Sequence, residues 1–292
     1  MTLREALHGA RERRVALGHF NVAEFATLKA VFEAARSLNV PVIIGVSESE
    51  RDFLGVRQIV AFIKSLRDEY SFPIFLNADH THSVERAREA IDAGFDAVLF
   101  DGGKLPLEEN IKSTKDVVDY ARIVSEREKR EIVIEGELGY IGASSEVFDE
   151  LPQGAMIREK DLTTAEDAER FVKETGVHLL APAVGNVHGM FRNAPNPRLY
   201  IVRIEEIREA TNIPLVLHGG SGTSDQDFRD AIAAGVSIVH ISTELRVAWR
   251  EGVARGLTRN VNEVAPYKIL PEAVSAVERV VLQRLKLFNR IL

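Results

Sequence analysis

Short apolar runs alternate with amphipathic segments along the chain. The runs are rich in valine, isoleucine, leucine and phenylalanine, and they occupy residues 15–22, 41–47, 73–80, 97–103, 131–139, 178–189, 214–220 and 236–242. Near-continuous apolar runs of this length are typical of parallel strands that are covered on both faces. The pattern therefore predicts eight buried strands.

The segments between these runs carry the periodicity of helices. Residues 25–39 place apolar side chains at i, i+3, i+4 and i+7, which gives one apolar face. Residues 83–94 begin at the possible N-cap Ser83 and end at Gly94. Residues 164–176 and 224–235 likewise begin at a capping residue and end at a glycine. We therefore expect a helix after each strand.

Eight strand–helix units predict an α/β fold of the (β/α)8 TIM-barrel type, with an additional C-terminal helix. A doubly wound sheet shows the same alternation and is the alternative. The barrel is favoured because polar residues follow many strands, whereas a doubly wound sheet gathers them near one switch point. We expect one domain, residues 1–292, in which residues 266–292 form a helical extension that packs on the barrel or joins subunits.

The composition excludes several classes of function. The net charge of -7 argues against a nucleic-acid surface, and the absence of cysteine excludes disulfides and thiolate ligands. No apolar run approaches the ~20 residues of a membrane-spanning helix. The charged N-terminal segment does not resemble a signal peptide. We therefore expect a cytoplasmic protein that binds neither nucleic acid nor membrane.

Histidines gather at the predicted ends of strands. His80, His188, His218 and His240 lie at or near the ends of strands three, six, seven and eight. Such ends converge on one mouth of a barrel, where three neutral imidazoles would suit Zn²⁺ or a similar divalent ion. Carboxylates accompany them, namely Asp79, Asp101, Glu135 and Glu137. Since Glu135 and Glu137 are two residues apart in a strand, both face the same side.

The motif HGGSGT at residues 218–223 follows the seventh predicted strand and precedes a helix. Glycine amides and a helix N-terminus favour an anion, and barrels commonly bind phosphate after strands seven and eight. No predicted strand ends in a lysine, so a Schiff-base mechanism is disfavoured. Chemistry at a carbonyl group would therefore use a metal as its Lewis acid.

Seven motifs occur in a family-specific order: FNV, PVIIGVS, NADH, FDGGKLP, EGELGYIG, VGNVHG and LVLHGGSG. Over roughly residues 1–250 the chain resembles the class II, metal-dependent fructose-bisphosphate aldolases and their tagatose-bisphosphate relatives. The resemblance implies cleavage of a phosphorylated ketose into dihydroxyacetone phosphate and an aldehyde. It also implies a homodimer or homotetramer.

The resemblance further implies roles for individual residues. It implies metal ligation by His80, His188 and His218, a further or transient metal position near Asp101 and Glu137, and acid/base chemistry by Asp79 at the aldehyde oxygen. It implies that phosphate and a monovalent cation, Na⁺ or K⁺, bind near Gly189, Gly219 and Ser221. Polar contacts to the triose phosphate are implied for Ser47, His240, Ser242 and Thr243.

Departures from the family pattern cluster in the expected substrate pocket. Gly103 replaces a serine and His240 replaces an asparagine. The family's mobile-loop glutamate aligns with Ser145, and Glu146 follows one place later, so Glu146 is the candidate for its catalytic role. A barrel that has diverged to act on, or only bind, another sugar phosphate is therefore the first alternative. A metal-dependent hydrolase that uses His80 and His82 is the second.

Overall fold

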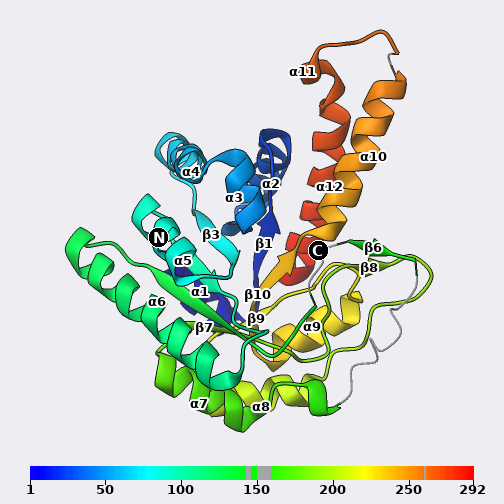
Figure 1. The fold of residues 1–292 in the computed structure, drawn as a ribbon. Coiled ribbons are helices and arrows are strands. Elements are labelled where there is room, and N and C mark those ends of the chain that lie inside the picture. The colour runs from blue at the N-terminus through cyan, green and yellow to red at the C-terminus, as the bar shows by residue number, and fades with distance from the viewer. Residues whose placement is uncertain (143–145, 150–158, 260) are drawn as a thin grey trace.

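Eight parallel strands close into a barrel in the computed structural model, which describes residues 1–142, 146–149, 159–259 and 261–292 (Figure 1). Around the barrel the strand order is β1-β10-β9-β7-β5-β4-β3-β2. The strands are β1 (Leu17–Asn21), β2 (Val42–Val46), β3 (Ile74–Thr81), β4 (Ala97–Phe100), β5 (Val133–Leu138), β7 (Leu179–Pro182), β9 (Leu215–Leu217) and β10 (Val236–Ile241). The predicted TIM barrel is thus confirmed.

Helices cover the outside of the barrel and one precedes the first strand. They are α1 (Leu3–Arg13), α2 (Phe25–Leu38), α3 (Glu48–Leu54), α4 (Val56–Tyr70), α5 (Val84–Ala93), α6 (Leu107–Glu128), α7 (Ala165–Thr175), α8 (Ile201–Thr211), α9 (Asp225–Ala234), α10 (Thr243–Arg259), α11 (Pro266–Ile269) and α12 (Pro271–Phe288). A short 3-10 helix spans Glu159–Asp161. The predicted caps of α5 are confirmed: the Ser83 hydroxyl accepts a hydrogen bond from the Arg86 amide, and Gly94 adopts φ +106°.

The barrel interior is apolar at one end and polar at the other. Leu3 and Leu7 of α1 pack in one cluster with the inward-facing Ile43 and Val216 of the strands. This cluster fills the amino-terminal end of the barrel, and α1 covers it. The carboxyl ends of the strands carry the buried histidines, carboxylates and amides instead. The fold therefore directs the chain's chemistry to the carboxyl-terminal mouth.

The predicted strand at residues 178–189 was too long, because β7 ends at Pro182. Proline cannot donate to the strand ladder, and Gly185, at φ +100°, turns the chain away. Beyond this turn a second small sheet forms, in which β6 (Val147–Phe148) pairs in parallel with β8 (Met190–Phe191). The apolar pattern could not separate the barrel strand from the loop that follows it.

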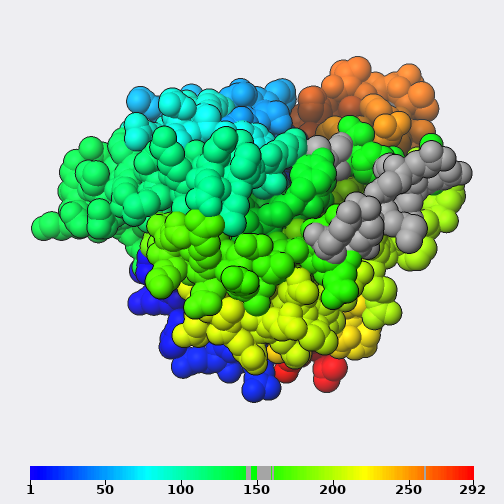
Figure 2. Space-filling view, turned by 60° about the horizontal axis from the view of Figure 1, so that its bottom comes forward, coloured from blue at the N-terminus to red at the C-terminus, as the bar shows by residue number. Residues whose placement is uncertain are grey.

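The C-terminal helices form both a buried layer and an arm. Leu285 and Phe288 of α12 are fully buried, and the Phe288 ring lies 5.2 Å from that of Phe228. The other ends of α10 and α12, joined by α11, extend beyond the remaining elements as a helical hairpin, visible as an orange lobe in the space-filling view (Figures 1 and 2). The tip exposes Val264 and Tyr267. Within the described ranges, no helix is long and apolar enough to cross a membrane.

Candidate active site

A cavity of about 540 Å³ opens at the carboxyl-terminal mouth of the barrel. Most residues singled out from the sequence line it: Ser47, Asp79, His80, Asp101, Glu137, His188, Gly189, His218, Gly219, Ser221, His240, Ser242 and Thr243. Residues that sequence reasoning did not single out also line it, among them Asn21, Tyr140 and Arg246. Segments far apart in the chain thus meet around one cavity.

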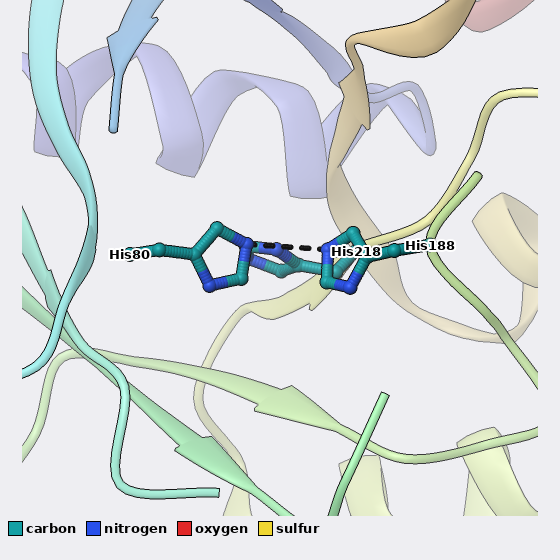
Figure 3. A group of neighbouring side chains, drawn as sticks. All are labelled: His80, His188 and His218. Carbon is teal, nitrogen blue, oxygen red and sulfur yellow. Dashed lines mark hydrogen bonds between the residues drawn. The ribbon is translucent and has the colours of Figure 1, made fainter. Parts of the chain in front are cut away.

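Three imidazoles converge in this cavity. His80 lies on β3, His188 precedes β8 and His218 follows β9. Figure 3 shows His80 reaching toward His188 and His218 from the opposite side of the mouth. The Nε2 atoms of His80 and His188 are 3.2 Å apart, and one nitrogen from each of the three rings lies within 4.8 Å of the others. Three candidate ligand atoms therefore surround a single point.

The second nitrogen of each imidazole is held by the protein. Nδ1 of His80 lies 2.8 Å from Asp101, Nδ1 of His188 donates to the Gly142 carbonyl at 3.1 Å, and Nε2 of His218 lies 2.9 Å from Glu135. Ligand histidines are commonly oriented in this way by a carboxylate or carbonyl. Each ring thus turns its other nitrogen toward the common point.

The residues present fit a divalent metal. Zn–N bonds of about 2.0–2.1 Å place the nitrogens of a tetrahedral site about 3.3–3.4 Å apart, close to the 3.2 Å between His80 and His188. Two imidazole lone pairs facing each other at this distance repel unless a proton or a metal lies between them. Nδ1 of His218 is buried and has no hydrogen-bond partner among the described residues, so it is available as a ligand atom.

Buried carboxyl groups around the histidines also favour a cation. Asp101 and Glu137 form a further group of possible ligands with His80. Oε2 of Glu137 is buried and makes no hydrogen bond within the described part of the chain. Burial raises the pKa of Glu137 and of Glu135 well above the ordinary value. A bound dication would oppose this shift and stabilise both carboxylates.

Asp79 and His80 are adjacent in sequence yet both belong to the site. Neighbours in a regular strand point to opposite faces. Here the register between β3 and β4 shifts between Ala78 and Thr81, and His80 adopts φ +32°, in the left-handed region. A bulge of this kind re-aims side chains, and it is typical of active sites. The irregular end of β3 therefore delivers a carboxylate and an imidazole to the same mouth.

Asp79 is buried, and one of its oxygens accepts a hydrogen bond while the other lies near an imidazole. The Asn21 amide donates to Oδ2 at 2.8 Å, and Nδ1 of His240 lies 3.4 Å from Oδ1. The same Asn21 amide donates to Glu50 at 3.0 Å. Burial alone would raise the pKa of Asp79, but the nearby His80 and His240 hold that pKa well below its ordinary value. Asp79 is therefore ionised at neutral pH, the state in which a carboxylate can accept a proton.

The imidazoles of the site differ in basicity. Burial, reinforced by the charge on His80, lowers the pKa of His188 and of His218 to about 3. Burial would also lower the pKa of His80, but Asp79 and the hydrogen bond to Asp101 outweigh it and raise that pKa to about 10. His188 and His218 are thus neutral, as metal ligands must be, whereas a metal at His80 would have to displace a proton.

His240, which replaces a family asparagine, lies in a stack of rings. Its ring is 3.4 Å from that of His19 at an interplanar angle of 4°, and 3.8 Å from that of His218. His19 and His240 face each other across neighbouring strands β1 and β10. Gly45 makes room for this stack, since a Cβ atom there would lie 2.0 Å from the His19 ring. Nothing in the spacing of these residues predicted the pairing.

Loops with glycine and serine form one side of the cavity. Gly189 and Gly219 adopt φ +93° and +63°, a region that favours glycine. The Ser221 hydroxyl accepts hydrogen bonds from the amides of Ser242 and Glu244, both at 3.2 Å, and so joins the loop after β9 to the first turn of α10. Backbone amides and the N-terminus of the long helix α10 thus meet where the sequence predicted a phosphate.

Other predicted residues lie differently. Glu146 is exposed and is not among the residues that line the cavity, while Ser145 lies outside the described residues. His82 lines the cavity but is largely exposed, and its ring is 6.4 Å from that of His80, so it does not join the three-histidine group. At Gly103 a Cβ atom would lie 2.7 Å from the Gly139 carbonyl, which explains why this loop does not accommodate the family's serine.

Sequence reasoning missed several supporting residues. The pattern placed Glu135 beside Glu137 but did not indicate that Glu135 holds His218. Asn21 lies inside the motif FNV, yet nothing in that motif predicted its contacts to Asp79 and Glu50. Such contacts join residues from separate elements, so only the folded barrel reveals them.

Comparisons with known proteins agree with this geometry. The family model described as fructose-bisphosphate aldolase class-II matches residues 1–291. The chain is 36% identical to the 6-phospho-5-dehydro-2-deoxy-D-gluconate aldolase of Bacillus subtilis, an alignment that covers 99% of this chain and 95% of the relative. It is 33% identical to the fructose-bisphosphate aldolase of Geobacillus stearothermophilus, with 99% and 96% covered.

A solved structure shows the same fold. The crystal structure of the YdjI aldolase from Escherichia coli superposes with a TM-score of 0.81 at 28% identity, covering 98% of this chain and 96% of that one. The match therefore extends over the barrel and the C-terminal helices alike. The chain belongs to the class II fructose-bisphosphate aldolase family, whose members are generally metal-dependent, and it is a carbon–carbon lyase that acts by aldol cleavage on a phosphorylated ketose.

Proposed function

We propose that the chain cleaves its phosphorylated ketose into dihydroxyacetone phosphate and an aldehyde, with Zn²⁺ held by His80, His188 and His218. The observation that carries the proposal is the orientation of these three imidazoles. One nitrogen of each is held by Asp101, Gly142 or Glu135, and the others surround one point. When bound, the ion supplies Lewis-acid polarisation of the substrate carbonyl. Asp101 and Glu137 would hold a further or transient metal position beside His80.

Asp79 is the proposed acid/base. In cleavage it takes the proton from the hydroxyl on the fourth carbon as the bond between the third and fourth carbons breaks. The hydroxyl becomes the aldehyde carbonyl, and the electron pair of the broken bond passes to the carbonyl of the ketose. The ionised state of Asp79 and the hydrogen bond from Asn21 support this role. In condensation Asp79 returns the proton to the new hydroxyl.

The third carbon must then gain a proton to give dihydroxyacetone phosphate. Glu146 is the proposed donor, from the segment after β5. It is exposed and lines no part of the cavity in this structure, so the role requires the segment to close over the substrate. Loop closure of this kind is common in barrel enzymes.

The triose-phosphate half is proposed to bind on the glycine side of the mouth. Gly189, Gly219 and Ser221 would contact the phosphate, together with Na⁺ or K⁺ as a possible counter-ion. Ser242 and Thr243 at the start of α10 favour an anion through the helix N-terminus. Ser47 and His240 line the same cavity and would contact the rest of the substrate.

Exchange of carbon-bound hydrogen tests this proposal before the aldehyde is known. Dihydroxyacetone phosphate would be incubated with the protein in deuterium oxide, and the proton signal of its third carbon followed by NMR. We expect the signal to weaken with Zn²⁺ present, because one of its two hydrogens is replaced by deuterium, and to keep its full intensity with a chelator until Zn²⁺ is returned. Persistence with Zn²⁺ demonstrably bound would contradict the proposal.

Two ketoses would then separate the possible substrates. The relatives are named for fructose bisphosphate and for 6-phospho-5-dehydro-2-deoxy-D-gluconate. Cleavage of each would be followed by trapping the triose phosphate. The replacement of the family asparagine by His240 favours the second candidate function, a site that has diverged toward another sugar phosphate. Cleavage of neither compound, with exchange retained, would support this divergence.

Assembly and location are part of the proposal. We propose a homodimer or homotetramer in the cytoplasm, without nucleic-acid or membrane partners. The exposed apolar tip of the arm formed by α10, α11 and α12 supports self-association. Sedimentation equilibrium would test it, since a monomer at micromolar concentration would contradict it.

A further inference from the structure

The end of β3 holds a conformation that needs support. His80 is a non-glycine residue at φ +32° beside a register shift, and such backbone costs free energy unless its surroundings fix it. The same distortion brings Asp79 and His80 to one mouth. A relaxed, regular strand would turn one of the two side chains away. Some group must therefore hold the backbone on both sides of His80.

Arg51 contacts the backbone at this place. Its guanidinium donates to the carbonyl of Asp79 at 3.1 Å and to the hydroxyl of Thr81 at 3.1 Å, the residues that flank His80. It also donates to the carbonyl of Val46 at 2.9 Å, at the end of β2. One planar group thus ties the distorted end of β3 to its neighbouring strand.

The burial of Arg51 shows that it does more than fill space. The side chain is 1% exposed, on the short helix α3 that follows β2. A buried charge carries a large desolvation cost, and an apolar side chain of similar volume often packs as well or better. Arg51 is not among the residues that line the cavity, so it reaches no substrate directly. Within the described residues, its hydrogen bonds reach the site through Asp79 and Thr81.

We propose that Arg51 is a positioning residue that fixes the distorted end of β3, and so sets the orientation of both the metal ligand His80 and the acid/base Asp79. The inference rests on the proposed function for what these two residues do. The geometric part does not, because Arg51 would orient His80 toward His188 and His218 whatever the substrate. Loss of its three hydrogen bonds would let the end of β3 relax, and His80 would then move away from His188 and His218.

Two substitutions test this inference. Arg51→Lys keeps the charge and most of the stem but cannot reach three acceptors with one planar group. Arg51→Ala leaves a cavity that millimolar guanidinium can enter. Arg57→Lys, an exposed arginine on the neighbouring helix α4, is the matched control. Far-UV circular dichroism would verify that each variant folds.

Co²⁺ is the probe of the ligand set, because its visible spectrum reports coordination geometry without turnover. We expect Arg51→Lys to alter this spectrum and to weaken Co²⁺ and Zn²⁺ binding about 10–100-fold, the usual effect of losing a residue that orients a ligand. In hydrogen exchange on dihydroxyacetone phosphate, kcat should fall more than KM rises. Guanidinium should restore the spectrum and metal affinity of Arg51→Ala, while methylammonium should not. Arg57→Lys should match the wild type in every assay.

The outcomes separate the two proposals. A wild-type spectrum, metal affinity and kcat in Arg51→Lys would overturn the positioning role, even if the variant melts at a lower temperature. Absence of hydrogen exchange in the wild type, combined with an altered Co²⁺ spectrum in Arg51→Lys, would instead defeat the proposed function and leave the positioning role standing. If Arg51→Ala folds only with guanidinium, Arg51→Lys decides the question.

Discussion

At the residue scale, Asp79 is the side chain whose role can be isolated most cleanly. It contacts Asn21 and His240 but belongs to neither group of possible ligands that contains His80. We expect Asp79→Ala to lower the rate of cleavage by about 10²–10⁴, the usual contribution of a general acid/base. Zinc content, measured by atomic absorption, should stay at the wild-type level. Cleavage at the wild-type rate would remove Asp79 from the mechanism.

Glu135 makes a different contribution, because it orients the proposed ligand His218 through the ring nitrogen that does not face the metal position. Its Oε1 lies 2.9 Å from Nε2 of His218, and both residues are fully buried. Glu135→Gln keeps the shape and an acceptor but removes the negative charge. We expect zinc affinity to fall about 10-fold, with the fold intact. Competition against a fluorescent zinc chelator would measure this, and Glu131→Gln on the protein surface is the control. Equal affinities in the two variants would show that the charge of Glu135 does not act on the metal.

The sequence predicted which side chains form the site better than it predicted the residues that hold those side chains in place. Histidines and carboxylates at strand ends could be picked out because a barrel brings all such ends to one mouth. The residues that hold them could not, since Asn21 on β1 and Glu50 and Arg51 on α3 act through contacts between separate elements. The resemblance assigned both Asp79 and His80 to the site, and the bulge in β3 explains how two adjacent residues reach one mouth.

At the element scale, strands and helix caps followed the local pattern, whereas strand ends did not. Ser83, Thr164 and Ser224 cap their helices by accepting a hydrogen bond from an amide three residues ahead, as short-range patterns predict. The overlong strand prediction failed at Pro182, where the run of apolar residues continues into a loop. Apolar loop residues at a barrel mouth pack against other loops, so hydrophobicity alone cannot mark the end of a strand.

His178 joins two strands and makes their pairing sensitive to pH. Its amide donates to the Ile134 carbonyl, and its Nδ1 accepts from the Ile134 amide, both at 2.8 Å. Burial, with the charge of Arg4, lowers the pKa of His178 to about 4. The unfolded chain binds the proton more tightly, so this stabilisation is complete above the ordinary pKa of about 6.5 and is lost as pH falls toward 4.

We therefore expect the free energy of unfolding to fall by about 1–2 kcal/mol through His178 between pH 7 and pH 5. Urea denaturation at several pH values would measure it in the wild type and in His178→Gln. The variant should show a shallower decline over this range. His8→Gln, at an exposed position, should follow the wild type. Parallel curves for His178→Gln and the wild type would contradict the assignment.

At the scale of the whole molecule, apolar residues at one end of the barrel stabilise the fold, and polar residues at the other end form the site. The amino-terminal end is filled by apolar side chains and covered by α1. The carboxyl-terminal mouth collects ionisable groups that a folded protein would otherwise avoid burying, including Asp79, Glu135 and Glu137. The number of strand–helix units predicted this architecture. That the 292 residues form one domain stays a prediction, as does a role of the arm in assembly.

The concentration of buried charge makes the stability of the whole barrel depend on the metal. Without a cation, the mouth relies on the proton of His80 and on the raised pKa values of Glu135 and Glu137 to limit repulsion among its buried groups. A ligand that binds only the native state stabilises it by about 2.7 kcal/mol when its concentration is 100 times Kd. For a chain of 292 residues, that corresponds to an increase in Tm of about 4 °C.

We expect calorimetry to show a lower Tm after chelation and recovery when Zn²⁺ is added, at constant protein concentration and scan rate. In His188→Ala, addition of Zn²⁺ should shift Tm much less, because the ligand set is incomplete. The contrary result is a wild-type Tm that changes with neither chelator nor Zn²⁺, when atomic absorption verifies that the metal was lost. It would mean that protonation of His80 and the raised pKa values of Glu135 and Glu137 already neutralise the buried groups of the mouth. The buried charges would then be tuned for catalysis alone, because the fold would be equally stable without the ion they are arranged to receive.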